Sequence, residues 1–387
     1  MTLTASPARI LFVTPVTPFS SASGSEQRSA LMLEALSGVG CVDVLQLKPG
    51  STSQVQRLPH SEHLSLLAEL AGSGLSPTRY QPKAALTHSI ESHLGRKLSD
   101  YQLIVGRYVW PVCQLLVPDH IPVVVDLDDF HYRYAKQSRW TLTTTRERLI
   151  KAATHFLVRR QLHRFSGAFV VSTQDQQEVE MNRGLPTVFL PNVPFGKGAQ
   201  RSPIPQLKQV LFVGSLWYRP NADGVNWYLQ HVWPKVLASL PDARLTLVGA
   251  APPHVRAAWA EHQGVSAPGF VDDLATTYQH ASLVVVPLHS GGGTNIKVLE
   301  ALAHDRPCLM TDFVAKAFAG HLSSQSEILV ATHAEDFITQ TLAALRHPER
   351  LQSLADAGQQ AVQRLFSTEL FKSRVADFAR QILSNPP

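Results

Sequence analysis

The chain has 387 residues, which is long enough for two domains. With 44% hydrophobic and 17% charged residues it has the composition of an ordinary globular protein, and no apolar run approaches the roughly 20 residues of a membrane-spanning helix. The three cysteines (Cys41, Cys113 and Cys308) are widely spaced, which argues against a disulfide framework or a metal cluster and is typical of a reducing compartment. The N-terminus lacks the layout of a secretory signal, so we expect a cytoplasmic protein.

In the first half of the chain, short β-branched runs alternate with helical patterns. Segment Ser51–Tyr80 is less regular; its leucines at Leu64, Leu67 and Leu70 suggest a short helix inside a long loop. Strands are predicted at Ile10–Thr14, Val42–Leu47, Leu103–Val105, Val123–Leu127, Phe169–Ser172 and Val188–Leu190, and helices at Gln27–Leu36 and Thr145–Arg164.

The residues between His131 and Arg164 are strongly basic, with nine Lys or Arg against the single acid Glu147. Aromatic residues such as Trp140 and Phe156 are interleaved with these charges. Such a mixture suits the surface of an anionic membrane or an acceptor that bears phosphate, although most charge runs are simply solvated helix faces. No recognised nucleic-acid module accompanies it, so we do not expect nucleic acid to bind. The expected location is therefore cytoplasmic, with peripheral contact at the inner face of the membrane through residues 131–164 as one alternative.

The stretch Pro191–Gln206 contains four prolines and two glycines and predicts a linker. Beyond it the alternation resumes, which predicts a second parallel sheet covered by helices on both faces. The expected layout is an N-terminal domain 1–192, a linker 193–206, a C-terminal domain 207–366 and a final helix in 367–387 that packs back on the first domain. The second-half strands are predicted at Gln209–Val213, Arg244–Val248, Leu283–Pro287, Pro307–Met310 and Ile328–Val330, and the helices at Asp223–Leu240, Asn295–Ala303, Phe337–Arg346 and Thr368–Leu383.

The most informative stretch is Pro287–Thr311, in which an apolar strand, a triple-glycine turn and a helix follow one another. Glycine lets the backbone approach a ligand closely, and the first N–H groups of a helix point the positive end of its dipole at one spot. That spot favours an anion such as a phosphate. Glu300 lies about 1.5 turns into the helix, where a carboxylate suits a vicinal diol such as a ribose. A plain surface loop, with Glu300 facing solvent, is the alternative.

Several motifs occur in a specific order: ILFVTPVTPF before a Gly-Ser loop, VVVDLDDF, AFVVSTQD, PNVPF, VLFVGSLWYRPNADGV, DARLTLVGAAPP, GFVDDL and SGGGTNIKVLEALA. In this order and spacing the chain resembles retaining glycosyltransferases of the GT-B architecture, family 4, over nearly its whole length. It is most similar to the polysaccharide-type members, whose donor loop reads GGGT or GAGT before a Lys-x-x-Glu helix. The resemblance implies an α/β fold of two Rossmann-like, doubly wound domains that face each other across a cleft.

The resemblance also implies roles for individual residues, with a nucleotide-sugar held by the C-terminal domain. Glu300 matches the second glutamate of the family's E-x7-E motif and would bind the ribose, and Asp128 aligns with a catalytic-site histidine or aspartate. His289, just before the glycine loop, either touches the donor or is a loop histidine bonded to backbone. The remaining implied contacts are the amides of Gly293, Thr294 and Asn295 with the diphosphate, Lys297 and Arg219 as its basic partners, Phe270 and Val271 with the base, and Gly24 in a loop that approaches the donor.

Two positions depart from the family pattern. Gly292 stands where the first glutamate of the E-x7-E motif is expected, and Gly214-Ser215 replaces the usual Gly-Arg pair, which leaves Arg219 as the phosphate arginine. Trp217 and Tyr218 follow directly; they either line the donor cleft or pack under the linker. The sequence Asp126-Leu127-Asp128-Asp129 could bind a divalent metal, but carboxylates at a strand end can equally cap the next turn.

The sequence therefore predicts a metal-independent retaining glycosyltransferase with no cofactor apart from its co-substrate. The donor would be a UDP- or GDP-sugar, and the acceptor a glycan or a lipid-linked molecule in polysaccharide or glycolipid assembly. The alternative is a non-catalytic GT-B-shaped partner that binds a nucleotide-sugar or a membrane, which the departures at Gly292 and Ser215 motivate.

Overall fold

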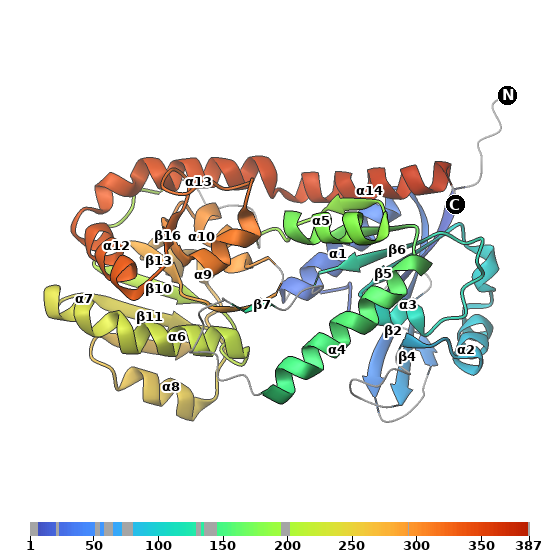
Figure 1. The fold of residues 1–387 in the computed structure, drawn as a ribbon, viewed down its shortest axis with the longest axis horizontal. Helices are drawn as coiled ribbons and strands as arrows, with labels where there is room; N and C mark the ends of the chain where they lie inside the picture. The colour runs from blue at the N-terminus through green and yellow to red at the C-terminus, as the bar shows by residue number, and fades with distance from the viewer. Residues whose placement is uncertain are drawn as a thin grey trace. The chain divides into compact units, whose positions relative to one another are not determined.

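The computed structural model describes residues 7–20, 23–50, 55–57, 65–71, 80–128, 133–134, 145–194, 202–292 and 294–385. These residues form two compact units, each built on its own sheet (Figure 1). The first unit comprises the described residues in 7–128, 145–192 and 368–385, and the second comprises 133–134 and the described residues in 193–367.

The first unit contains an eight-stranded sheet in the order β3-β4-β2-β1-β5-β6-β8-β9, in which all neighbours are parallel except β3 and β4. Strand order reverses between β1 and β5, because the chain runs outward from β1 in one direction and from β5 in the other. The strands are β1 (Ala8–Thr14), β2 (Gly40–Gly50), β3 (Val55–Arg57), β4 (Ser65–Ala71), β5 (Leu103–Arg107), β6 (Val123–Leu127), β8 (Gly167–Val170) and β9 (Thr187–Phe189).

Helices cover both faces of this sheet, which explains why its central strands read as continuous apolar runs. On one face, Leu11 and Val13 of β1 pack into a cluster with residues of α2 and α3. On the other face, α14 approaches β8 so closely that a Cβ at Gly167 would lie 2.5 Å from Phe378 of α14. The helices are α1 (Gly24–Ser37), α2 (Ala84–Leu94), α3 (Val109–Cys113), α4 (Thr145–Gln161), α5 (Thr173–Arg183) and α14 (Thr368–Ser384), with 3-10 turns at Leu98–Asp100 and Leu162–Arg164.

The prediction for segment Ser51–Tyr80 was wrong where the structure describes it. Ser65–Ala71 is strand β4, which pairs in parallel with β2, and Val55–Arg57 is the antiparallel edge strand β3. The three-residue spacing of Leu67 and Leu70 suggested a helix, but the run SLLAELA is short and mainly apolar, and such a run fits a strand equally well. Leu64 lies outside the described residues.

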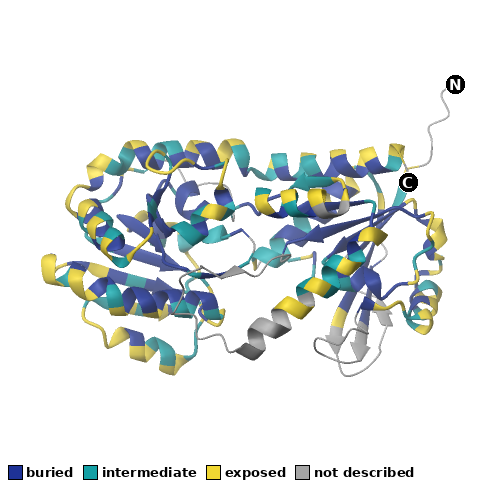
Figure 2. Cartoon of the chain, viewed as in Figure 1, coloured by how far each residue is buried: buried dark blue, intermediate teal, exposed yellow. Residues whose placement is uncertain are grey.

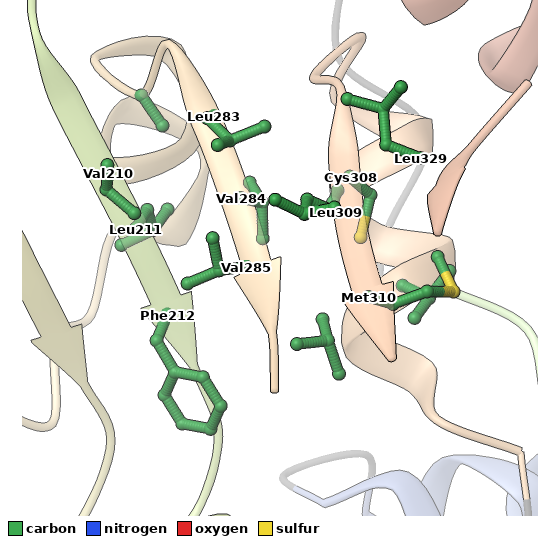
Figure 3. Close-up of a cluster of buried hydrophobic side chains, with 14 of the residues drawn as sticks. Val210, Leu211, Phe212, Leu283, Val284, Val285, Cys308, Leu309, Met310 and Leu329 are labelled. Atoms are coloured by element: carbon green, nitrogen blue, oxygen red, sulfur yellow. The ribbon is translucent and has the colours of Figure 1, made fainter. Parts of the chain in front are cut away.

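The second unit contains a six-stranded parallel sheet in the order β12-β11-β10-β13-β15-β16, with the reversal of strand order between β10 and β13. Its central strands β10, β13 and β15 are buried, and Val210, Val284 and Leu309 are among the apolar side chains that they contribute to the core (Figures 2 and 3). The strands are β10 (Gln209–Val213), β11 (Arg244–Val248), β12 (Val265–Gly269), β13 (Leu283–Val286), β15 (Cys308–Thr311) and β16 (Leu329–Ala331).

The long helix predicted at Asp223–Leu240 is two helices in the structure, α6 and α7, and α6 begins four residues earlier than predicted. The break falls at Val232 because Pro234 cannot donate a backbone hydrogen bond and is tolerated only in the first turn of a helix. The helices of this unit are α6 (Arg219–His231), α7 (Trp233–Ser239), α8 (Pro253–Ala260), α9 (Leu274–Gln279), α10 (Ile296–Ala303), α11 (Asp312–Ala315), α12 (Ala334–Arg346) and α13 (Gln352–Leu365), with 3-10 turns at Lys316–Phe318 and Pro348–Leu351.

Candidate active site

The predicted glycine loop and the end of strand β10 meet in the second unit, at the point where its strand order reverses. Ligands of open α/β sheets bind beyond the carboxyl ends of the strands at such a point. Gly214 follows β10, and a Cβ placed there would lie 3.0 Å from Cε of Lys297 and 2.9 Å from Nδ2 of Asn221. A side chain at 214 would displace one or both of these groups, so the glycine lets the lysine of α10 lie over the end of β10.

The glycine loop enters helix α10 through backbone that a side chain would strain. Gly291 has φ of +136°, in the range that favours glycine. Ser290 and Gly291 form strand β14, which pairs with β7, residues Arg133–Tyr134. This pairing was not predicted, because its two strands lie more than 150 residues apart in the sequence. Gly292 and Thr294 continue the loop, whereas Gly293 lies outside the described residues.

Helix α10 starts without a side-chain cap, since the Asn295 side chain makes no capping hydrogen bond to its first turn. Instead, Nζ of Lys297 donates to Oδ1 of Asn295 over a long 3.4 Å. The first turn of a helix carries backbone N–H groups that have no partner within the helix. Together with the Lys297 ammonium, these groups make the start of α10 a positively polarised spot.

Burial lowers the pKa of Lys297 to about 8, and the Glu300 carboxylate opposes this shift only in part. The residue is partly buried, so its side chain keeps some accessible surface. A desolvated cation gains strongly from a nearby anion, because little water screens the pair. Lys297 is therefore suited to bind a group that brings negative charge.

Glu300 is held on the buried side of α10, where the residue is only 6% exposed. Its Oε2 accepts a hydrogen bond from Oη of Tyr278 on α9 at 3.2 Å. Tyr278 in turn stacks on His304, with ring centroids 4.6 Å apart. Burial and the neighbouring Glu300 raise the pKa of Tyr278, so its hydroxyl stays protonated and remains a donor. Sequence reasoning did not single out Tyr278, which lies 22 residues before its partner.

The other predicted residues of the second unit fall into two groups. Ser215 and Arg219 follow Gly214; Arg219 begins α6 and lies 3.7 Å from the Asp223 carboxylate. Phe270 and Val271 follow β12, two strands away along the same carboxyl edge, and Phe270 is 73% exposed.

The interior of this region holds His289 and Asn221. His289 packs edge-on against Trp227 with ring centroids 4.6 Å apart, and burial lowers the pKa of its imidazole. Sequence analysis missed Asn221. Its Nδ2 donates to the Ser215 carbonyl at 2.7 Å, while its buried Oδ1 has no hydrogen-bond partner among the described residues.

Trp217 and Tyr218 lie between Gly214 and α6. Trp217 is 68% exposed, so it does not pack under other parts of the chain that the structure describes. A Cβ at Gly291 would lie 3.4 Å from Oη of Tyr218, which places this tyrosine beside the glycine loop. Both aromatic residues therefore stand at the same sheet edge as Lys297.

The first unit has its own charged cluster at the carboxyl edge of its sheet. Arg28 of α1 forms a bidentate ion pair with Asp126, with Nη2 2.6 Å from Oδ1 and Nε 2.8 Å from Oδ2. Arg107, at the end of β5, donates to Oδ2 of Asp126 at 2.8 Å and to Oδ2 of Asp128 at 3.0 Å. Asn192 completes the set by donating to Oδ1 of Asp128 at 3.2 Å.

Arg28 also contacts the two segments of this unit that flank residues 193–367 of the second unit. Its Nη1 donates to the Leu190 carbonyl at 2.9 Å and to Oδ1 of Asn192 at 3.2 Å. Its guanidinium lies 5.3 Å from the ring centroid of Phe371, near the start of α14. Asn192 is the last residue of the unit before the chain passes to the second unit, and α14 begins where it returns.

Burial alone would raise the pKa of Asp128, but Arg28, Arg107 and the Asn192 amide hold it below its ordinary value. Asp128 is therefore ionised, and each of its oxygens accepts a hydrogen bond. Among the described residues no group of three or more His, Cys, Asp or Glu could hold a metal ion, and Asp129 lies outside them. Gly24 is the first residue of α1, after the Ser23 cap.

Sequence analysis overlooked Arg28, Arg107 and Asn192. A signal for two of them exists, because Arg107 ends the buried strand LIVGR and Asn192 belongs to the PNVPF motif. Side chains at the carboxyl ends of neighbouring parallel strands meet at one edge, and that rule applied to β5 and β6 would have paired Arg107 with the aspartates.

Two doubly wound units, each built on its own sheet, are the architecture of the GT-B class of α/β proteins, which the sequence predicts. Solved structures of low identity share this fold. Sucrose-phosphate synthase from Thermosynechococcus elongatus has a TM-score of 0.67 and 18% identity, covering 97% of this chain and 99% of that one. A UDP-forming trehalose-phosphate synthase from Burkholderia xenovorans has a TM-score of 0.64 and 13% identity, covering 98% and 99%. WaaG, a glycosyltransferase involved in lipopolysaccharide biosynthesis, has a TM-score of 0.62 and 16% identity, covering 95% and 99%.

Within this fold, residues 207–347 match the family described as glycosyl transferases group 1, and the predicted resemblance to family 4 is consistent with this match. Over 138 residues the chain is 27% identical to an uncharacterized 44.6 kDa protein in the cps region of Klebsiella pneumoniae. That match covers 32% of this chain and 35% of that protein, about a third of each. The family match supports a role in glycosyl transfer. In the part of the chain that the structure describes, none of the helices has both the length and the apolar character to cross a bilayer.

Proposed function

We propose that the protein is a retaining glycosyltransferase that moves a sugar from a UDP- or GDP-sugar to a glycan or lipid-linked acceptor. The observation that carries this proposal is the meeting of Lys297 with Gly214 where the second sheet reverses its strand order. A desolvated ammonium and the open start of α10 converge there, which suits the diphosphate of a nucleotide-sugar.

The chemistry is substitution at the anomeric carbon with a nucleoside diphosphate as the leaving group. Negative charge grows on the phosphate oxygen as the glycosidic bond breaks, so donors fixed around that oxygen stabilise the transition state more than the bound substrate. Lys297 and the first backbone N–H groups of α10 provide such donors. Arg219, whose side chain is partly exposed at the start of α6, adds a second cation.

For the rest of the donor, we assign the ribose to Glu300 and the base to the main chain at Phe270 and Val271. Tyr278 holds one oxygen of Glu300, which fixes the orientation of the carboxylate. Gly292 provides no side chain for the hydroxyls of the transferred sugar, so other residues must select that sugar.

Retention needs no strong protein base if the departing phosphate accepts the proton of the acceptor hydroxyl. Asp128 fits this scheme as a fixed negative charge that steadies the positive charge on the sugar ring. Both of its oxygens already accept hydrogen bonds, and its pKa lies below the ordinary value, so it is poorly suited to take up a proton.

We further propose that transfer proceeds without a divalent metal or another cofactor. Asp126 and Asp128 are paired with guanidinium groups, which a metal ion would have to displace. Full activity in the presence of a chelator is expected, and restoration of a chelator-inhibited enzyme by Mg²⁺ or Mn²⁺ would contradict this.

The acceptor assignment to polysaccharide or glycolipid draws support from the names of similar proteins. WaaG is described as acting in lipopolysaccharide biosynthesis, and the Klebsiella relative comes from a cps region. Exposed Trp217 and Tyr218 offer aromatic faces on which sugar rings can pack. Trp217→Ala is expected to raise the KM for the acceptor several-fold while leaving nucleotide affinity unchanged.

Contact with an anionic membrane is proposed for helix α4 and the turn after it. Phe156 is 59% exposed, and Arg160, whose guanidinium lies 5.9 Å from that ring centroid, and Arg164 are exposed too. Binding to vesicles rich in anionic lipid should weaken with salt and in Arg160→Glu. Binding that ignores both changes would remove this part of the proposal.

The central test incubates the purified protein with a panel of UDP- and GDP-sugars and membrane-derived acceptors. Release of nucleotide that depends on the acceptor is expected, with a product whose anomeric configuration, read by NMR, matches that of the donor. Nucleotide binding without transfer from any donor would favour a non-catalytic partner protein. An inverted product would leave a transferase but overturn retention.

A further inference from the structure

The five charged and polar side chains at the carboxyl edge of the first sheet form an ordered chain of contacts. Asp126 is fully buried and engages both Arg28 and Arg107, whereas the side chain of Asp128 is 11% exposed. Asp128 is thus the carboxylate of the pair that reaches the surface, and Asp126 is the internal one. The two arginines balance the two aspartates in charge.

Arg107 joins the two carboxylates through the fork of its guanidinium. Nη1 points to Asp126 and Nη2 to Asp128, at 2.8 and 3.0 Å. A planar group with two nitrogens at fixed separation can hold two acceptors in one geometry, which a lysine ammonium cannot do. Because Asp126 is also fixed by Arg28, the position of Arg107 is set from the buried side.

The surroundings of Arg107 are arranged for this fork. Tyr108 adopts φ of +63°, a backbone conformation that is unfavourable for any residue with a side chain. Its ring lies 4.9 Å from the Arg107 guanidinium, and its hydroxyl accepts from Nη2 at 3.3 Å. The Tyr108 backbone N–H donates to the Asp126 carbonyl at 3.1 Å, which holds the strained residue in place.

The buried Nε of Arg107 has no hydrogen-bond partner among the described residues. A buried donor without a partner is uncommon in folded proteins. The guanidinium is therefore oriented so that Nη1 and Nη2 donate to the two aspartates, while its Nε has no partner among the described residues.

We propose that Arg107 is a positioning residue for glycosyl transfer, which fixes the exposed carboxylate of Asp128 while Asp126 fixes Arg107. This inference rests on the proposed function, in which the Asp128 carboxylate steadies the positive charge on the sugar ring. Arg107 itself touches no substrate; it acts through the direction and the ionisation of Asp128.

The test compares Arg107→Lys, Arg107→Gln, Asp128→Asn and the double variant Arg107→Lys/Asp128→Asn. The control is Arg96→Lys, because Arg96 forms an arginine–aspartate pair with Asp43 elsewhere in the same unit, at 3.0 Å. For each protein, kcat, the KM for the donor and the rate at several pH values are measured. The melting transition of the first unit, followed by calorimetry, counts the folded molecules, because the substituted residues belong to that unit.

Arg107→Lys is expected to lower kcat on the order of 10²-fold, as small misplacements of a catalytic group do, with the donor KM within twofold of wild type. The double variant should lose no more activity than Asp128→Asn alone, because both changes disable the same carboxylate. In Arg107→Gln the acidic limb of the pH profile should move to higher pH, since Asp128 loses a cationic neighbour. Arg96→Lys should behave as wild type.

Three results would overturn the inference. One is a kcat of Arg107→Lys within twofold of wild type although Asp128→Asn is strongly impaired. This result would remove the role of Arg107 and leave the proposed function intact. Another is an activity that falls in proportion to the fraction of folded molecules while the pH profile stays unchanged. This combination would indicate that Arg107 has a structural role alone. The third is full activity of Asp128→Asn, which removes the role of Asp128 although transfer by the wild type still stands.

A second variant tests the inference if Arg107→Lys does not fold. Tyr108→Phe removes only the hydroxyl that accepts from Nη2 of Arg107, and it should lower kcat several-fold. An unchanged kcat and pH profile in this variant would count against the inference.

Discussion

The carboxyl edges of the two sheets carry charge in opposite ways. In the first unit, arginine and aspartate side chains neutralise one another beneath the surface. In the second unit, Lys297 and the start of α10 form a positively polarised spot, and among the described residues the side-chain hydrogen bond of Lys297 is a long contact to Asn295. The first arrangement pairs its charges internally, whereas the second is the one that we propose to bind an anion. Stability should therefore depend on the first cluster and substrate binding on the second.

The largest effect is expected when the buried pair of the first unit is broken. Asp126→Asn leaves two buried guanidinium groups without a full countercharge, and such changes lower the free energy of unfolding by about 3–5 kcal/mol. Calorimetry should then show the transition of the first unit shifted down by roughly 10 °C. Asp242→Asn, which removes the exposed partner of Lys208, is the control. Equal melting curves for Asp126→Asn and Asp242→Asn would show that the buried ion pairs of the first unit contribute no more to stability than an exposed ion pair does.

The second prediction concerns turnover, which should depend on Lys297 of the second unit while stability should not. Lys297→Met should lower kcat by about 10²–10³, as removal of one fixed donor to a developing oxyanion does, while the melting temperature changes little. Lys235→Met, which removes an exposed lysine paired with Glu335 on the same unit, should leave kcat unchanged. A fully active Lys297→Met enzyme would mean that the phosphate binds elsewhere.

A smaller effect is expected at Glu300. Glu300→Gln keeps the shape of the side chain but replaces a charged acceptor with a neutral one, so affinity for UDP or GDP should fall by about tenfold or somewhat more. Calorimetric titration measures this, and Glu335→Gln serves as an exposed control. Unchanged affinity would show that the ribose does not contact this carboxylate.

The smallest effect is a pH dependence. Because the pKa of Lys297 is about 8, its positive charge is present below pH 8 and is lost above it. Affinity for a nucleoside diphosphate should therefore be full near pH 7 and about tenfold weaker at pH 9. Lys297→Arg keeps its charge across this range, so its affinity should stay level. A decline of the same size in that variant would assign the titration to another group.

Local patterns in the sequence predicted much of this arrangement. The strands at Gln209–Val213 and Arg244–Val248 have the predicted bounds, because buried β-branched runs between turn residues have few alternatives. The glycine loop and the Lys-x-x-Glu helix were likewise visible, since their chemistry is contained in one short stretch.

The remaining features depend on contacts between distant residues. Arg28 and Asp126 are 98 residues apart, and Asn192 lies 64 residues from Asp128, so no local pattern pairs them. Strand β4 was read as a helix because a mainly apolar run of seven residues does not distinguish the two, and only pairing with β2 decides between them. The pairing of β7 with the glycine loop is of the same kind.

Arg28 has a further consequence for the integrity of the first unit. One guanidinium contacts the buried Asp126 carboxylate, the residues just before Val193 and the ring of Phe371 near the start of α14. A single side chain therefore anchors two segments that are far apart in the sequence, the end of 145–192 and the start of α14, to the ion pairs at the carboxyl edge of the first sheet.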